Sequence, residues 1–483
     1  MRQQQKRFQL GSVVRSLLGL VALGVAVSGL SVLGVMYMRG AFRTSAEYEL
    51  ENAPAAEDPR FALAMVSLGN AIASEGAMTG FWVGAEDIYA ARLAAIREAQ
   101  FSIRFETYYM QPGQRADDFA AALIERSQAG VKVQVIADDH GSDDIPDEYW
   151  QTLENEGIEV RLFRQFDWRS PTDYNSRTHR KLLIIDGQTV LTGGAGVSDE
   201  WDGDPEIDDR APWLEFEVRY EGAIAQLLEG LFLQNWVQEG GSIDLAEALQ
   251  PRGSTQSAPQ PDSPDSTNLV PEPDPTAAGV QVEASNTNPT GIETTGATAA
   301  VEPLYITDDS ASLGESSVRM LTQLNALAAT ERLWLSSPYF IPDANTRRAL
   351  MDAQNRGVDV RILTMSEKTD KELVHYTSRE MYGDLLRAGV QICEYQPSMM
   401  HAKMTLVDRN WASTGSANFD PRSYFHNDEL NISASHPELV QNLEQFFSTA
   451  LQSSQCLTYE QWQQRPIWEQ AQGRFGLLFK NLL

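Results

Sequence analysis

The sequence predicts an α/β protein made of two similar halves, residues 81–239 and 301–465. Three observations lead to this prediction. Short apolar segments typical of strands alternate with segments of helical periodicity. The same order of segments occurs twice along the chain. Between the two copies, residues 240–300 are rich in Pro, Ser, Thr and Asn, a composition that offers little to bury and predicts a disordered linker.

The first half begins with a predicted strand at residues 101–110 (FSIRFETYYM). The next elements are predicted to be a helix over 117–129, a strand over 131–138, a helix that ends at Gly157 and a strand over 158–163. Gly130 and Gly157 come just after the two helices, where a glycine commonly ends a helix before a buried strand.

The second half has the same order of elements. A strand is predicted over 332–340, and the elements after it are a helix that ends at Gly357, a strand over 358–364, a helix that ends at Gly389 and a strand over 390–395. Glycine again marks both helix ends. A repeated order of this kind predicts that the two halves share one fold.

Residues 16–38 contain no charged side chain and are long enough to cross a bilayer as a helix. Four basic residues precede this segment, so residues 1–15 are predicted to be cytoplasmic and the rest of the chain to lie outside the inner membrane. Residues 39–80 form a predicted connector with a helix near 59–74, and residues 466–483 form a C-terminal segment. A cleaved signal peptide, with Ala-Val-Ser at 26–28 as its cleavage site, is the alternative.

Each half continues into a motif with the spacing H-x-K-x4-D. The first copy consists of His179, Lys181 and Asp186, and the second of His401, Lys403 and Asp408. Side chains two apart on an extended chain point to the same side, so each His lies beside its Lys. The second motif runs on to GSAN, which ends in Asn418. Two imidazoles and two ammonium groups suit attack on a phosphodiester, because that reaction needs a nucleophile, an acid for the leaving oxygen and cations for the phosphate oxygens.

These motifs, together with TGGAGVSDEW, SSPYFIPD, YQPSMMHAK and HNDELNI, resemble the phospholipase D superfamily and, within it, the bacterial cardiolipin synthases. The resemblance covers most of residues 80–465 outside the linker. It implies two α/β sandwich halves packed face to face with one active site between them. It also implies transfer of a phosphatidyl group through a phosphatidyl-histidine intermediate, with phosphatidylglycerol as substrate, cardiolipin as product and no metal or other cofactor.

The resemblance also implies roles for further residues. The two motifs, His179, Lys181, Asp186, His401, Lys403 and Asp408, form the catalytic set, in which we expect the two aspartates to anchor the motifs rather than to touch substrate. Ser416, Asn418 and Arg180 are expected to bind substrate. Glu429 is expected to orient an imidazole, and its counterpart in the first half is Glu215.

The chain departs from the family pattern at two positions. Glu215 stands where the family commonly has Asp. Gly196 stands at the end of GGAG, where the synthases usually have Asn. Because Gly196 has no side chain, we expect the first motif to lack one hydrogen-bond donor. We assign Glu106, in the first predicted strand, no definite role.

The composition restricts the partners. The net charge of −29 argues against a nucleic-acid partner. Cys393 and Cys456 fit no metal-binding spacing, and one disulfide between them is possible without support from the pattern. Two alternatives to cardiolipin synthesis stay open: a phospholipase D that uses water or another alcohol as acceptor, and a degenerate lipid-binding scaffold. The oligomeric state is not predicted.

The charge bias around residues 16–38 makes a prediction about topology. A reporter fused after Leu483 should be active when it functions only in the periplasm, and inactive when it functions only in the cytoplasm. Paired fusions to alkaline phosphatase and green fluorescent protein measure this. A fluorescent fusion with an inactive phosphatase would reverse the predicted orientation.

Overall fold

The computed structural model describes residues 24–37, 50–170, 173–203, 211–244, 292–293, 300–309 and 316–481. The fold is a mixed α/β fold, as the sequence predicts. The predicted anchor at 16–38 lies partly outside these residues: 24–37 are helical, and within the described part of the chain no helix is both long and apolar enough to cross a membrane. Most of the predicted linker, from 245 to 291, also lies outside them.

One set of elements runs from β1 to α6, and we call it the first repeat. Its elements are β1 (Ile72–Val83), α3 (Ala85–Glu98), β2 (Ser102–Thr107), α4 (Gln114–Gln128), β3 (Lys132–Asp138), α5 (Asp147–Asn155), β4 (Glu159–Phe163), β5 (Arg177–Thr178), β6 (Leu182–Ile185), β7 (Thr189–Gly193), β8 (Phe216–Glu221) and α6 (Ala223–Gln238).

The second repeat runs from β10 to α12. Its elements are β10 (Val301–Asp309), α8 (Ser317–Ala328), β11 (Arg332–Ser336), α9 (Ala344–Asn355), β12 (Asp359–Met365), α10 (Glu372–Ala388), β13 (Gln391–Tyr395), β14 (Met404–Val407), β15 (Trp411–Gly415), α11 (Pro421–Phe425), β16 (Asn427–Ala434) and α12 (Pro437–Gln452). Outside the repeats lie α2 (Pro59–Ser67), β9 (Ile292–Glu293), β17 (Ser454–Leu457), α13 (Tyr459–Gln463) and α14 (Ile467–Leu477).

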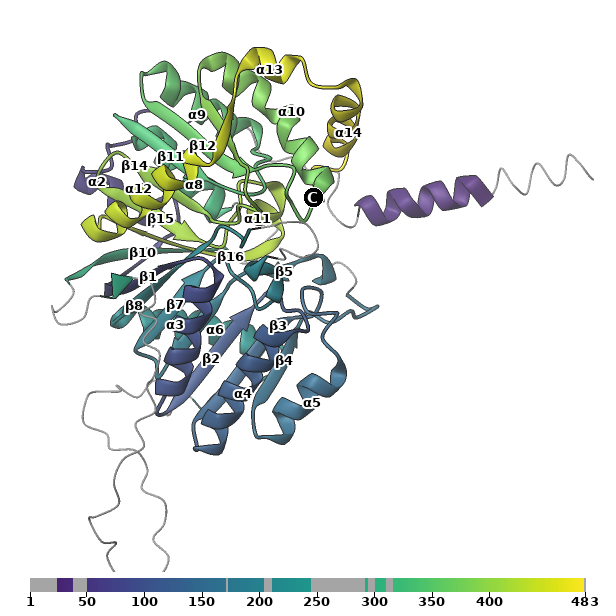
Figure 1. The fold of residues 1–483 in the computed structure, drawn as a ribbon, viewed down its shortest axis with the longest axis vertical. Helices are drawn as coiled ribbons and strands as arrows, with labels where there is room; N and C mark the ends of the chain where they lie inside the picture. Colours follow the sequence, from purple (N-terminus) through teal and green to yellow (C-terminus); the bar gives the residue numbers. More distant parts are fainter. Residues whose placement is uncertain are drawn as a thin grey trace, which may run out of the picture.

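The strands pair in the same way in both repeats. The order of hydrogen-bonded strands is β4-β3-β2-β6-β7-β8-β1 in the first and β13-β12-β11-β14-β15-β16-β10 in the second. Three strands of each repeat are parallel, and the others are antiparallel. The two sheets join where β1 pairs with β10 through residues 72–77. Figure 1 shows β1, β8, β10 and β16 in the middle of the molecule, between the two repeats.

The predicted helix ends agree with the structure. Gly130, Gly157, Gly357 and Gly389 all adopt positive φ angles, between 84° and 95°, just after α4, α5, α9 and α10. A residue with a Cβ is strained in this conformation, so glycine allows the chain to leave the helix and enter the next strand.

The start of the first repeat differs from the prediction. Residues 72–80 belong to β1, although they were assigned to the connector, and the helix expected near 59–74 ends at Ser67. Phe61 and Met65 of α2 are fully buried in the hydrophobic core of the second repeat, beside Leu321 and Leu324. Tertiary packing of α2 against α8 therefore sets its length, which local sequence does not reveal.

A shared core joins the two repeats. Phe216 of β8 packs edge-on against Phe446 of α12, with ring centroids 5.0 Å apart. Residues of α6 and α12, including Leu228 and Leu443, belong to the same buried cluster. The two repeats therefore form one folded body rather than two independent domains.

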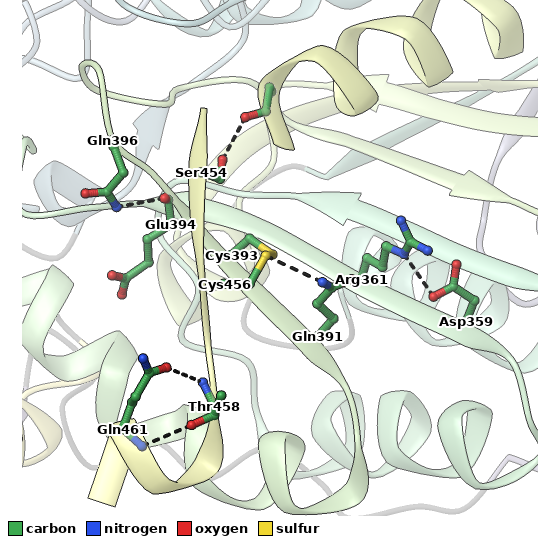
Figure 2. Close-up of a disulfide and its surroundings, with 11 residues drawn as sticks. Asp359, Arg361, Gln391, Cys393, Glu394, Gln396, Ser454, Cys456, Thr458 and Gln461 are labelled. Carbon is green, nitrogen blue, oxygen red and sulfur yellow. Dashed lines mark hydrogen bonds and ion pairs between the residues drawn. A yellow bond between two sulfur atoms is a disulfide. The ribbon is translucent and has the colours of Figure 1, made fainter. Parts of the chain in front are cut away.

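Cys393 and Cys456 form a disulfide, which the sequence left undecided. Figure 2 shows the bond between the neighbouring strands β13 and β17. The two cysteines are directly opposite each other in this antiparallel pair, and the Gln391 amide nitrogen lies 3.5 Å from the Cys456 sulfur. The bond fixes β17 to the sheet of the second repeat. The helices α13 and α14 follow β17 in the chain, so the bond also limits where they can lie. Sequence spacing could not identify the pair because 63 positions separate the cysteines.

Candidate active site

In both motifs the His and the Lys lie just before a central strand of the sheet. His179 and Lys181 precede β6, and His401 and Lys403 precede β14. All four side chains are buried, with 2–7% of their surface exposed. The two pairs lie close enough together that the charges of both lysines act on both His179 and His401. The structure therefore brings the two sequence motifs into one site.

Each imidazole is held by a carboxylate from the other repeat. His179 Nδ1 lies 3.0 Å from Glu429 Oε2, and His401 Nδ1 lies 2.9 Å from Glu215 Oε2. The two carboxylates are almost completely buried. The sequence identified all four residues but not this exchange of partners. We call these residues, with Lys181 and Lys403, the catalytic cluster.

The backbone explains why the partners are exchanged. β5 pairs in parallel with the start of β16, and the His179 amide donates to the Asp428 carbonyl at 2.9 Å. On the other side, the His401 amide donates to the Leu214 carbonyl at 2.9 Å. In both cases the acceptor is the residue just before the glutamate. Each motif is thus paired to the strand of the opposite repeat that carries its carboxylate.

The two lysines are held next to the histidines. Lys181 Nζ donates to the His179 carbonyl at 2.7 Å, and Lys403 Nζ lies 3.0 Å from Nδ1 and 3.1 Å from Nε2 of His401. Burial lowers the pKa of Lys181 to about 7 and that of Lys403 to about 8, while Glu215 and Glu429 oppose this shift in both. An anion bound here would raise both pKa values, because its negative charge would stabilise the ammonium groups that burial has deprived of water.

The two carboxylates differ in their surroundings. Glu429 accepts hydrogen bonds from Ser416 at 2.5 Å and from Ser423 at 2.6 Å in addition to its contact with His179. Burial alone would raise the pKa of Glu429, but His179, Lys181 and Ser416 together lower it to about 2. Glu429 is therefore an ionised group in a complete hydrogen-bond shell.

Glu215 has fewer donors. Besides His401 it accepts from the Phe216 amide at 3.0 Å. Gly194 occupies the position that corresponds to Ser416, and a Cβ there would overlap the Glu215 carboxylate, so no hydroxyl can reach it from this position. Burial raises the pKa of Glu215 to about 7. The carboxylate of Glu215 fills the space that the side chain of Ser416 occupies at the corresponding position of the second repeat.

Both histidines are neutral at neutral pH. Burial lowers the pKa of His179 to about 4, with the charge of Glu429 acting against this shift, and burial followed by the charges of Lys403 and Lys181 lowers the pKa of His401 well below its usual value. A neutral imidazole that donates from Nδ1 to a carboxylate keeps a lone pair on Nε2. Each ring can therefore attack an electrophile or accept a proton.

Aromatic side chains pack against the two imidazoles. The ring centroid of Tyr108 lies 5.2 Å from that of His179, and Trp201 and Trp213 lie 5.5 and 5.8 Å from His401. Trp201 and Trp213 belong to one hydrophobic core cluster. They are buried, and they also fix the orientation of His401, a role that their place in TGGAGVSDEW and APWLEF only hints at.

Two groups of predicted site residues have other roles. Arg180 points away from the cluster and forms a buried ion pair with Asp308 at 2.5 Å, because neighbouring residues on an extended strand face opposite sides. Its assignment to substrate binding is corrected. Ser416 hydrogen bonds to Glu429 and so supports the cluster from behind, whereas Asn418 lines a small cavity together with Lys403.

Asp186 and Asp408 anchor the motifs, as we expected, and are not part of the reacting groups. They lie past the far ends of β6 and β14, at φ angles of 55° and 51°. Asp186 accepts from the amides of residues 100–102 at 2.7–2.9 Å, and Asp408 accepts from those of residues 330–332 at 2.7–3.1 Å. They thereby fix the turns that lead into β2 and β11.

The departure at Gly196 has a packing cause. A Cβ at Gly196 would lie too close to the Tyr109 carbonyl, and the Gly196 carbonyl accepts from Arg92 at 3.0 Å and from Tyr89 at 3.2 Å. The backbone here is therefore part of a buried polar network that leaves no room for a side chain. Glu106 also receives a role: it accepts from Thr178, next to His179, at 2.5 Å and from Asn235 at 2.8 Å.

The cluster combines the groups that phosphodiester exchange requires. Two imidazoles supply a nucleophile and a proton carrier, and two ammonium groups can stabilise the phosphate oxygens. Among the described residues, no group of three or more His, Cys, Asp or Glu side chains is arranged to hold a metal ion.

Comparisons with known proteins agree with this geometry. The family model described as "Cardiolipin synthase, PLD-like domain" matches residues 93–201 and 321–451. The "Cardiolipin synthase A" of Pseudomonas syringae pv. syringae (strain B728a) is 30% identical over 371 residues, which cover 76% of this chain and 67% of that protein. The "Cardiolipin synthase" of Geobacillus sp. (strain WCH70) is 28% identical over 429 residues, which cover 88% of this chain and 76% of that protein.

A solved structure shares the fold. The phosphatidylserine synthase of Haemophilus influenzae Rd KW20 superimposes with a TM-score of 0.59 at 14% identity, over 88% of this chain and all of that chain. The chain belongs to the cardiolipin synthase family of phospholipase D-like proteins. It is a phosphatidyltransferase of this superfamily.

The depressed lysine pKa values predict an alkaline limit to activity. Lys181 loses its proton near pH 7 and Lys403 near pH 8 in the free enzyme, so kcat/KM for the lipid should begin to fall above about pH 7. On the acid side, protonation of His179 should become limiting only near pH 4. Steady-state kinetics between pH 4 and 10 measure both limits.

The matched variant is Lys181→Arg, because Lys181 has the lower pKa and loses its proton first, whereas arginine stays charged throughout this range. The variant should keep its activity to higher pH than the wild type, whatever its maximal rate. An unchanged alkaline limit in Lys403→Arg, and in Lys181→Arg, would show that neither lysine sets it.

Proposed function

We propose that this protein makes cardiolipin by transferring a phosphatidyl group from one phosphatidylglycerol to another, with release of glycerol. The observation that carries the proposal is the reciprocal cluster, in which each repeat supplies one His and the carboxylate of the other His. The names of the relatives support the choice of substrate and product.

In the first step, Nε2 of His179 attacks the phosphorus of the donor and the bond to the glycerol oxygen breaks. At neutral pH the His401–Glu215 pair can hold one extra proton, because the pKa of Glu215 is about 7. As Nε2 of His401 gives its hydrogen to the glycerol oxygen, Nδ1 takes the proton of Glu215, and glycerol leaves. In the second step, the free hydroxyl of another phosphatidylglycerol gives its proton to His401 and attacks the phosphorus, which releases His179 and forms cardiolipin. Lys181 and Lys403 hold the nonbridging oxygens in both steps.

The unequal carboxylates support this division of labour. Glu429 is ionised and fixed by two hydroxyl donors, so it can stabilise the positive charge that His179 gains on attack. Glu215 has a pKa near 7, so the His401–Glu215 pair can lose and regain a proton at neutral pH. Nucleophile and proton carrier thus have the surroundings that their tasks require.

Burial of both histidines favours an alcohol over water as acceptor. Only 7% of each His is exposed, so water has little access to the intermediate. The hydroxyl of a second lipid can reach the intermediate when that lipid binds at the site and excludes water. The intact cluster also argues against a degenerate binding scaffold. Hydrolysis is the second candidate only because water can be the acceptor in the same chemistry.

We further propose that the enzyme is anchored in the inner membrane by residues 16–38 and that the two repeats lie in the periplasm. The basic residues before this segment support the orientation. The Cys393–Cys456 disulfide supports it independently, because such bonds form and persist in oxidising compartments.

A product assay tests the function. The full chain, reconstituted in vesicles that contain phosphatidylglycerol labelled in both glycerol moieties, should yield cardiolipin and free glycerol in equal amounts. His179→Ala and His401→Ala should each lose activity by about a thousandfold or more, since covalent and acid–base catalysis belong to one coupled reaction. Phosphatidic acid as the main product would replace the synthase proposal by hydrolysis.

A trapping experiment tests the division of labour. With a donor whose leaving group needs no proton, His401→Ala should still form a labelled enzyme and His179→Ala should not. Label on His401 in the His179→Ala variant would reverse the roles.

The exchanged pairing adds a matched comparison. Glu429→Gln should slow the labelling of His179 although Glu429 lies in the other repeat, whereas Glu215→Gln should leave labelling with this donor nearly unchanged. Equal effects of the two substitutions would contradict the assignment of Glu429 to the nucleophile.

A further inference from the structure

The C-terminal helix α14 turns its large apolar side chains toward solvent and buries a glutamate and two glycines. The residues that it packs against α10 are Glu469, Gly473 and Gly476, which are buried. Its outward side carries Phe475, which is 56% exposed, and Leu478 just after the helix is 69% exposed. Trp468 is 55% exposed at the edge of this side, where its ring packs edge-on against Tyr376 of α10 at 5.6 Å. A surface helix normally turns its apolar side inward. An outward apolar stripe of this kind indicates contact with a partner that is itself apolar.

The segment after Glu469 is basic, although the whole chain is acidic and Arg474 lies 3.8 Å from Glu380 of α10. The chain has a net charge of −29, yet no acidic residue follows Glu469, while Arg474 and Lys480 are exposed on the same segment. Tryptophan and phenylalanine beside basic side chains are the composition of a segment that lies in the interface of an anionic bilayer.

The stripe belongs to a helix that packs on α10, and α10 begins close to a residue whose charge acts on the catalytic cluster. Two glycines bring α14 close to the first turns of α10, because a Cβ at Gly473 would meet the Tyr376 carbonyl and one at Gly476 would meet Thr377 and Leu373. α10 begins at Glu372, just after Asp370, whose charge acts on Lys403. Figure 1 shows α14 beside α10 at the outer edge of the second repeat.

A second apolar group comes from the first repeat. In the segment after β4, Phe166 and Trp168 are 65% and 73% exposed, and the Arg169 guanidinium lies over the Trp168 ring at 5.1 Å. Phe166 packs edge-on against Tyr174, which in turn lies beneath the Arg177 guanidinium, two residues before His179.

The second group lies against the second repeat. Tyr174 packs against His140, with ring centroids 6.2 Å apart. Next to Tyr174, the Asn175 carbonyl accepts a hydrogen bond from Arg422 of α11 at 3.0 Å. The segment that carries Phe166 is therefore held where the two repeats meet, near His179.

We propose that the outward face of α14 and the Phe166–Arg169 segment form a membrane-docking surface that inserts into an anionic phospholipid bilayer and holds the catalytic cluster at the lipid interface. The docking surface would let both lipid substrates reach the buried histidines without leaving the bilayer. The inference rests on the proposed function for the identity of those substrates, whereas insertion into lipid is a physical property that can be measured without turnover.

Site-specific quenching tests the insertion. Leu478→Cys and Leu63→Cys are matched positions, since the two leucines are 69% and 65% exposed and the native cysteines are joined in a disulfide. Each full-length variant is labelled with a fluorophore and reconstituted in phosphatidylglycerol–phosphatidylcholine vesicles with brominated acyl chains. The label at 478 should be quenched at least about tenfold more than the label at 63 in α2.

Three outcomes would overturn the proposal. The label at 478 could remain in water, both labels could be quenched equally, or an unlabelled Leu478→Cys variant could form a 478–478 disulfide between two chains in place of quenching. The last result would identify a second copy of the chain as the partner of this face.

Activity provides a separate readout. Trp468→Ser/Phe475→Ser should lower turnover of phosphatidylglycerol in vesicles by about tenfold, and leave turnover of a short-chain phosphatidylglycerol dissolved as monomers unchanged. Leu63→Ser is the control. Equal losses on both substrates would show that the helix acts on the cluster itself and would contradict docking. If the wild type turns over neither lipid but the label at 478 is quenched, the proposed function fails while the docking surface stands.

Discussion

The exchange of carboxylates between the two histidines is the constraint on which the rest of the structure depends. His179 takes Glu429 and His401 takes Glu215, so neither repeat contains a complete site. The exchange requires β5 to pair with β16 and residue 214 to pair with the segment before His401. The continuous sheet through β1 and β10 and the shared core of α6 and α12 keep the two repeats in the register that these pairs need.

Burial gives the cluster its chemistry at a cost in stability. Two lysines and two carboxylates share a space from which water is largely excluded, and each compensates the charge of the others. The same burial keeps the imidazoles neutral and the ammonium groups ready to gain stabilisation from a phosphate. An acidic protein can therefore bind an anionic headgroup, since the local arrangement of charges, and not the net charge of −29, meets the substrate.

The two repeats have the same framework and different details. Ser416 and Ser423 complete the shell of Glu429, while Gly194 leaves Glu215 without a hydroxyl partner. Identical surroundings would give two equivalent histidines. The smaller number of donors around Glu215 separates the pKa values of the two carboxylates, and unequal partners suit a reaction in which one imidazole attacks and the other moves protons.

The sequence by itself predicted the α/β class, the repeated order of elements, the glycines that end the helices and the two His–Lys pairs, because periodicity, positive-φ glycines and motif spacing are local properties. The resemblance to a family added Glu215 and Glu429. Only the tertiary structure decided which carboxylate meets which histidine, that Arg180 faces Asp308, that β1 begins at Ile72 and that Cys393 meets Cys456. Each of these depends on contacts between residues far apart in the chain. Strand pairing brings such residues together, and the pattern of one segment carries no record of its partner.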